Sequence, residues 1–267
     1  MAMCYNHADR IGNEGDVAKH AVLAAFVATL IEQPQALPFI YVESHTGRAL
    51  YQGLPRNGRW ENGIGPFSDR LLAEEALEDT SYPNLRVYGN ACFHTKILAG
   101  SDYHGSSGLV FRMLRKAGIP FRFHLWDNDT TVCHSLMSFF ENWPEVSICR
   151  GDGYEGVCMI RNPTLALIDP ISIKGQDERS RILSILNHLG ANEIPFICWT
   201  AIVEGEETAV EAFSAAVETD FSTHRVTWQP APGTTTKGCQ ITVPKGSWES
   251  LAGNTLGELR QLMEWIK

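Results

Sequence analysis

The chain lacks the sequence features of several common protein classes. It has seven cysteines, an odd number, and none of them belongs to a C-x-x-C motif. This argues against a disulfide framework and against a structural zinc site. The most apolar stretch, residues 21–31, is too short to span a bilayer, and His7, Asp9 and Arg10 interrupt any apolar core of a signal peptide. We therefore expect a soluble, cytoplasmic protein.

Basic residues are scarce as well. Lys and Arg number 22 against 31 Asp and Glu, which gives a formal net charge of −9. This balance argues against broad, non-specific binding to a phosphate backbone, although a local basic face remains possible. Hydrophobic residues make up 44% of the 267 residues, enough for a sizeable core. At roughly 150 residues per domain, the length predicts one large α/β domain or one domain with an insertion.

Strand and helix patterns alternate along most of the chain. Short apolar runs rich in β-branched and aromatic residues predict strands at 38–43, 121–126, 146–149, 164–168 and 195–200, and a final strand pair at 224–228 and 238–243. Helices are predicted at 17–32, 68–79, 107–116, 130–142, 178–189, 206–217 and 256–266. This order predicts a mostly parallel sheet with an antiparallel C-terminal edge hairpin. The glycine-rich and helical segment 52–104 interrupts the alternation, which predicts an inserted subdomain within a single domain, 1–267.

An acidic residue follows each of four predicted strands: Glu43, Asp127, Asp152 and Asp169. In such a sheet, ligands bind beyond the carboxyl ends of the strands, so these carboxylates are expected at one edge. Four acceptors there favour a ligand with hydroxyl and amine donors. No G-x-G-x-x-G follows the first predicted strand, and G-x-x-x-x-G-K-[ST] does not occur, which disfavours dinucleotides and P-loop phosphates. A nucleoside without phosphate fits better, and S-adenosylmethionine is the obvious candidate.

Several motifs are similar to those of a known family. At the family's ungapped N-terminal spacing, the chain has Tyr5, His7, Gly12, Asn13, Asp16, Val17, Lys19 and His20. Further matches are Glu43-Ser44-His45-Thr46-Gly47, Gly105-Ser106-Ser107, Asp152-Gly153-Tyr154, Ile168-Asp169-Pro170, and Lys237-Gly238 followed by Pro244. Over nearly its whole length the chain resembles the RlmJ family, S-adenosylmethionine-dependent methyltransferases that methylate an adenine amine in large-subunit ribosomal RNA. The resemblance implies a Rossmann-like class I methyltransferase fold, with S-adenosylhomocysteine as product.

The resemblance also assigns roles to residues. It implies that Lys19 and His20 hold the methionine carboxylate, and that Glu43, His45 and Gly47 form the turn beneath the cofactor. Asp127 would accept from the ribose hydroxyls, and Asp152, followed by Gly153, from the adenine amine. Ser106 is a further cofactor residue, although 100–101 offers a competing alignment. On the acceptor side, Asp169 and Pro170 would hold the amine, with Tyr5 and His7 covering it.

The acceptor motif departs from the family. Adenine amino-methyltransferases carry [DN]-P-P-[YF], whose aromatic ring stacks on the base, a contact worth roughly 1–3 kcal/mol. Here Ile171 and Ser172 follow Asp169-Pro170, and Thr200 replaces a family Tyr. We therefore expect cofactor binding to be kept and the acceptor to differ from ribosomal RNA, the family's RNA partner, with a small molecule as one possibility.

Other readings stay open. A cofactor-binding homologue without turnover would show the same cofactor motifs. A metal-dependent hydrolase could draw on His124, Asp127, Asp129 and His134, but H-E-x-x-H is absent and His124 and Asp127 face opposite sides of a strand. No metal site is therefore predicted. A covalent Ser or Cys enzyme lacks a nucleophile-elbow motif.

Overall fold

A seven-stranded sheet organises the part of the chain that the computed structural model describes, which is residues 11–33, 38–76, 82–230 and 234–263. Its strand order is β5-β4-β1-β6-β7-β9-β8. The strands are β1 (Phe39–Glu43), β4 (Phe121–Asp127), β5 (Val146–Arg150), β6 (Leu165–Ile168), β7 (Phe196–Val203), β8 (Phe221–Thr227) and β9 (Thr236–Pro244). The first five run parallel, and β9 lies antiparallel between β7 and β8. This is a Rossmann-like α/β fold with a mostly parallel sheet and an antiparallel C-terminal edge hairpin, as predicted.

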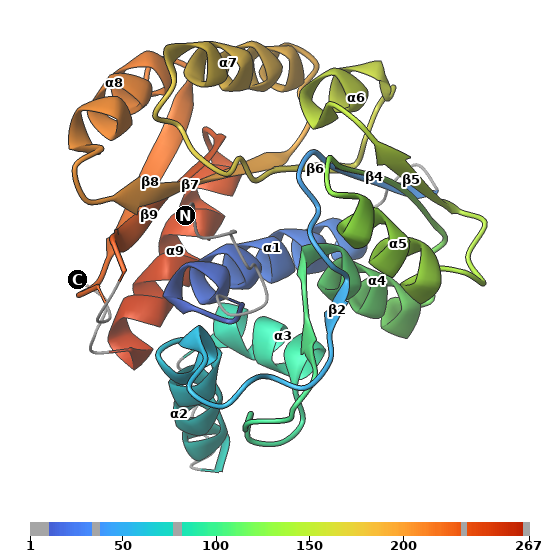
Figure 1. Ribbon diagram of the computed structural model, residues 1–267, viewed down its shortest axis with the longest axis vertical. Helices are drawn as coiled ribbons and strands as arrows, with labels where there is room; N and C mark the ends of the chain where they lie inside the picture. The colour runs from blue at the N-terminus through green and yellow to red at the C-terminus, as the bar shows by residue number, and fades with distance from the viewer. Residues whose placement is uncertain (1–10, 34–37, 77–81, 231–233, 264–267) are drawn as a thin grey trace.

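Helices cover both faces of the sheet (Figure 1). On one face lie α6 (Gly153–Met159), α7 (Gln176–Ala191) and α8 (Glu207–Val217). On the other lie α1 (Glu14–Glu32), α4 (Ser106–Ala117), α5 (Thr130–Phe139) and α9 (Ser247–Leu262). Each face has its own cluster of buried apolar side chains, so most side chains of the central strands are buried against one helical layer or the other.

Helix α1 is buried on nearly all sides, as its apolar composition predicts. It packs against the sheet strands β7 and β9 on one side and against α3 (Pro83–Cys92), α4 and α9 on the others. Asn13 caps its start by accepting a hydrogen bond from the Asp16 amide at 3.1 Å. The helix therefore begins at Glu14, three residues before the predicted start.

The segment 52–104 supplies the outer cover of α1. It contains the short 3-10 helix η2 (Arg59–Glu61), α2 (Ile64–Ala76) and α3, and it ends in β3 (Tyr103–His104), which pairs antiparallel with β2 (Leu50–Tyr51). Its buried side chains, among them Phe67 and Tyr88, belong to the same apolar cluster as the sheet residue Phe123. The proposed boundaries of this insertion stay a prediction.

The sequence patterns located the main strands but not every helix. Helices α3 and α6 and the strands β2 and β3 were not predicted, because the helices are short and contain glycine. Helix α9 begins at Ser247 rather than at residue 256, since Gly253 and Gly257 obscure its apolar period. Helix α5 ends at Phe139 rather than at residue 142. Within the described ranges, no helix is both long and apolar enough to cross a bilayer.

Candidate functional site

The four predicted acidic residues do lie at one edge of the sheet. Glu43 ends β1 and Asp127 ends the neighbouring β4. Asp152 lies two residues after the end of β5, and Asp169 comes directly after β6. The parallel register aligns these ends, because Glu43 pairs with Leu125 on one side and with Leu167 on the other. The carboxylates therefore meet where open α/β sheets bind their ligands.

The loops at this edge are fastened to one another. The Gly47 amide donates to Asp127 Oδ2 at 3.1 Å, and the Asp129 amide donates to Oδ1 at 2.8 Å. Gly47 has a φ of 64°, a conformation that glycine adopts without steric cost. Gly153 lies so close to the β1 loop that a Cβ atom there would meet the Ser44 carbonyl oxygen at 1.8 Å. The loops after β1, β4 and β5 thus form one close-packed backbone cradle.

Glu43 is fully buried beneath this cradle. The Ser106 hydroxyl, at the start of α4, donates to Glu43 Oε1, and the Tyr41 hydroxyl donates to Oε2 at 3.0 Å. Burial raises the pKa of Glu43 to about 8, even though the Ser106 hydrogen bond and the Lys19 charge act in the opposite direction. This contact brings Ser106 to the carboxyl end of β1. Both residues support the cradle from below.

Lys19 reaches the same edge from α1. Its Nζ lies 2.7 Å from Asp169 Oδ2 and 3.2 Å from Asp16 Oδ1, and 5.5 Å from the centre of the Trp199 ring. Burial alone favours the neutral amine, but the Asp169 and Asp16 carboxylates raise the pKa of Lys19 above its ordinary value. The predicted carboxylate-binding cation and the predicted acceptor-binding Asp are therefore ion-paired with each other.

His20 points elsewhere. Only 2% of the residue is exposed, and its Nδ1 is 2.7 Å from the Tyr103 hydroxyl, which lies 3.2 Å from that of Tyr88. Burial and the neighbouring Lys19 charge lower the pKa of His20 to about 3, so the ring is neutral at physiological pH. Its placement among tyrosines of the apolar core does not support the predicted contact with the methionine carboxylate.

Asp152 has two structural partners. Its Oδ1 accepts from the Tyr154 amide at 3.0 Å and so caps α6, and its Oδ2 forms an ion pair with Arg181 of α7. His45 lies nearby, with Nδ1 2.8 Å from the Ser44 hydroxyl and its ring 4.9 Å from that of Tyr154, centre to centre. No sequence pattern indicates Arg181, because it lies on a different helix and only the fold brings it to Asp152.

The residues that follow Asp169 are those that the resemblance assigns to the acceptor side. Pro170 is buried, but Ile171 is 78% exposed and the Ser172 hydroxyl accepts from the Lys174 amide at 3.1 Å. Neither side chain offers a ring for stacking. Thr200 is buried and donates to the Gln240 carbonyl at 3.4 Å. Tyr5 and His7 lie outside the described residues.

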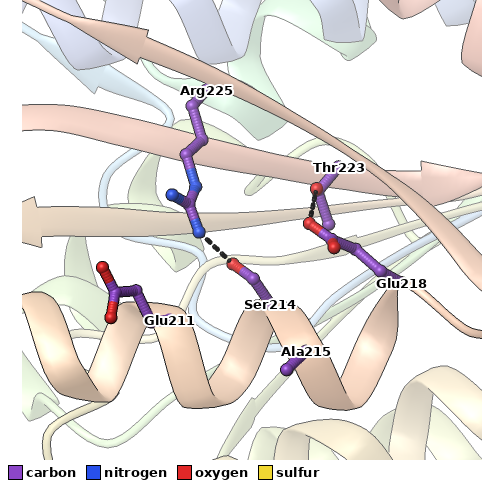
Figure 2. Close-up of a pocket in the computed structure, with 6 residues that line it drawn as sticks. All are labelled: Glu211, Ser214, Ala215, Glu218, Thr223 and Arg225. Atoms are coloured by element: carbon purple, nitrogen blue, oxygen red, sulfur yellow. Dashed lines mark hydrogen bonds between the residues drawn. The ribbon is translucent and has the colours of Figure 1, made fainter.

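A shallow pocket of about 520 Å³ lies elsewhere, between α8 and β8. Figure 2 shows Arg225 of β8 reaching the Ser214 hydroxyl, at 2.7 Å, across this pocket. None of the predicted site residues lines it. In the part of the chain that the structure describes, no three His, Cys, Asp or Glu side chains group as metal ligands would. His124 instead stacks on Trp126, with ring centres 6.2 Å apart.

Comparison with known proteins places the fold. The structure is similar to that of protein LPL1258 from Legionella pneumophila, described by the family model DUF519, with 20% identity, a TM-score of 0.74, and coverage of 95% of this chain and 94% of that one. An rRNA methylase from Streptococcus thermophilus aligns at 12% identity and a TM-score of 0.36, covering 52% of this chain and 80% of that one. The N-methyltransferase NodS from Bradyrhizobium japonicum, in complex with S-adenosylhomocysteine, aligns at 9% identity and a TM-score of 0.33, covering 47% of this chain and 67% of that one.

At 20% identity and a TM-score of 0.74, the similarity to the Legionella protein shows a shared fold. No family model matches the chain, and no curated protein matches it significantly. The chain has the fold of this Legionella protein. Membership of the RlmJ family stays a prediction.

The close contact at Gly153 predicts that Gly153→Ala destabilises the protein. The added methyl would overlap the Ser44 carbonyl, so the loops must separate, and we expect a loss of about 1–3 kcal/mol in the free energy of unfolding measured with urea. Gly151→Ala is the matched control, because a Cβ there meets nothing within 4 Å. Equal stability of the two variants would contradict the close-packed cradle.

The raised pKa of Glu43 predicts a specific pH dependence of stability. The unfolded chain binds the Glu43 proton only below about pH 4.5, whereas the folded protein keeps it up to about pH 8. The stabilisation from this group is therefore complete below pH 4.5 and is lost as the pH rises through 8. The stability of wild type relative to Glu43→Gln should fall between pH 5 and 8 in urea titrations.

The exposed Glu141→Gln is the control for this titration, and its stability should stay parallel to wild type. A constant difference between wild type and Glu43→Gln across pH 5–8 would show that Glu43 is ionised in the folded protein.

Proposed function

We propose that this chain is an S-adenosylmethionine-dependent methyltransferase whose cofactor lies at the carboxyl edge of β1, β4, β5 and β6. One observation carries the proposal: the carboxylates of Asp127 and Asp152 lie beside the Gly47 and Gly153 loops, at the edge where such sheets bind ligands. The Rossmann-like α/β fold agrees with it.

The residues present fit this cofactor. A nucleoside offers ribose hydroxyls and an adenine amine as donors, and carboxylates are acceptors with about four lone-pair sites each. Asp127 uses its oxygens for the Gly47 and Asp129 amides and keeps capacity for hydroxyl donors. The missing side chain at Gly153 lets the β5 loop lie close to the backbone of Ser44.

Within this site, each residue of the chain has a positional task. Asp127 holds the ribose and Asp152 the adenine amine, while Glu43 and Ser106 support the loop beneath. Lys19 orients Asp169 through their 2.7 Å contact, which leaves the second Asp169 oxygen to accept a hydrogen bond from the methyl acceptor. Bound S-adenosylmethionine would supply an electrophilic methyl group, so the protein contributes mainly by positioning.

The proposed acceptor differs from the family's ribosomal adenine. Ile171 and Ser172 are exposed and carry no ring, so a flipped base would lose its stacking partner at this loop. The net charge of −9 independently disfavours a long phosphate backbone as partner. A small nucleophile that Asp169 and the Pro170 carbonyl can hold fits these observations better.

A second candidate is a cofactor-binding homologue without turnover. The same absence of a ring after Pro170 favours it, and so does the pairing of Asp169 with Lys19. It shares the cofactor site with the first candidate and differs from it only in methyl transfer.

The experiment is a radiolabelled-methyl assay against ribosomal RNA and, in parallel, fractionated small-molecule extract. Label should enter a small-molecule fraction with wild type. Asp169→Ala, and Asp169→Asn as a variant of nearly the same shape, should lower transfer by about 100-fold or more, because the acceptor loses its positioning contact. Both should still bind S-adenosylhomocysteine.

Asp220→Asn serves as the control, since Asp220 is exposed in the turn before β8. Full activity of Asp169→Asn would refute the role of Asp169. Cofactor binding without any methyl transfer by wild type would favour the non-catalytic candidate.

A further inference from the structure

Helix α7 contacts the β5–α6 loop through two side chains on one of its faces. Glu178 and Arg181 are three residues apart, so they lie side by side on the helix. The Tyr154 hydroxyl donates to Glu178 Oε1 at 2.5 Å, and the Arg181 guanidinium pairs with Asp152. The same guanidinium lies 4.7 Å from the centre of the Tyr154 ring. The loop that ends at α6 is therefore held by α7.

These contacts account for both oxygens of Asp152. Oδ1 accepts from the amides of Tyr154 and Glu155 at 3.0 and 3.4 Å, and Oδ2 receives Arg181. Burial raises the pKa of Asp152, but the Arg181 hydrogen bond and the backbone amides outweigh it and hold the pKa below its ordinary value. The carboxylate is thus fixed in orientation and kept ionised.

An oriented, ionised carboxylate distinguishes an amine from a carbonyl. A carboxylate oxygen accepts a hydrogen bond from an exocyclic amine, whereas it repels the carbonyl oxygen that replaces this amine in hypoxanthine. Asp152 Oδ2 has a second lone pair, so the Arg181 contact leaves room there for this further donor.

We infer that Arg181 is a positioning residue that gives the cofactor site its preference for an adenine amine, by holding Asp152 from α7. The inference rests on the proposed function, because it takes Asp152 as the acceptor for the cofactor's amine. Arg181 belongs to none of the sequence motifs from which the cofactor site was predicted.

The test compares two ligands that differ only at the amine, S-adenosylhomocysteine and S-inosylhomocysteine, by calorimetric titration. Wild type should prefer the adenosyl compound. Arg181→Gln should weaken its binding about three- to tenfold, the effect of one hydrogen bond, and should leave binding of the inosyl compound within about twofold. Arg181→Lys keeps the charge without the forked geometry and should restore part of the preference.

Arg122→Gln is the matched control, because Arg122 is exposed near the start of β4, away from the carboxyl edge, and should behave as wild type. If Arg181→Gln weakens both ligands equally, its role is structural and the inference is wrong. Unchanged or tighter binding of the adenosyl compound also overturns it. Failure of wild type to bind either ligand would instead refute the proposed function itself.

Discussion

The ammonium of Lys19 is almost completely removed from water and is neutralised by Asp169 at 2.7 Å. Burying two charges is costly, and deleting one partner of such a pair typically destabilises a protein by about 3–5 kcal/mol. The pair joins α1 to the end of β6, and it can form only where α1 is pressed against the sheet. The outer layer of α2 and α3, which encloses α1, is thus connected to the geometry of the site.

The carboxylates at this edge have different tasks because their surroundings differ. Glu43 is fully buried and keeps its proton near neutral pH, so it acts as a hydrogen-bonded support for the loops. Asp152 is partly exposed and held by Arg181, which favours its charged form. Asp127 orders the turn at Gly47. One row of acidic residues therefore contains both a buried, hydrogen-bonded support and partly exposed carboxylates.

Local patterns predicted the strands and their acidic ends, since buried parallel strands are short apolar runs and their ends meet at one edge. The partners of these acids could not be predicted. Arg181 lies 29 positions after Asp152 and Lys19 lies 150 before Asp169, so only the packing of α7 and α1 reveals the contacts. The role predicted for His20 depended on its place beside Lys19 in the sequence. Adjacent residues of a helix face different directions, so the two side chains have different surroundings.

The fold does not determine which methyl acceptor the protein would use. The sheet fixes where the four carboxylates lie, while Ile171 and Ser172 carry no ring in the loop after Pro170. A fold can host many reactions, so the acceptor has to be established from the site itself.

The most direct test of the central claim is a calorimetric titration of the purified protein with S-adenosylhomocysteine, repeated with Asp127→Asn. We expect saturable binding at one site per chain. In the variant, binding should be about tenfold weaker or more, because the amide is a poorer acceptor for ribose hydroxyls and disturbs the contact with Gly47. Absence of binding to wild type, or equal binding by both proteins, would contradict the assignment of the cofactor site to this edge of the sheet.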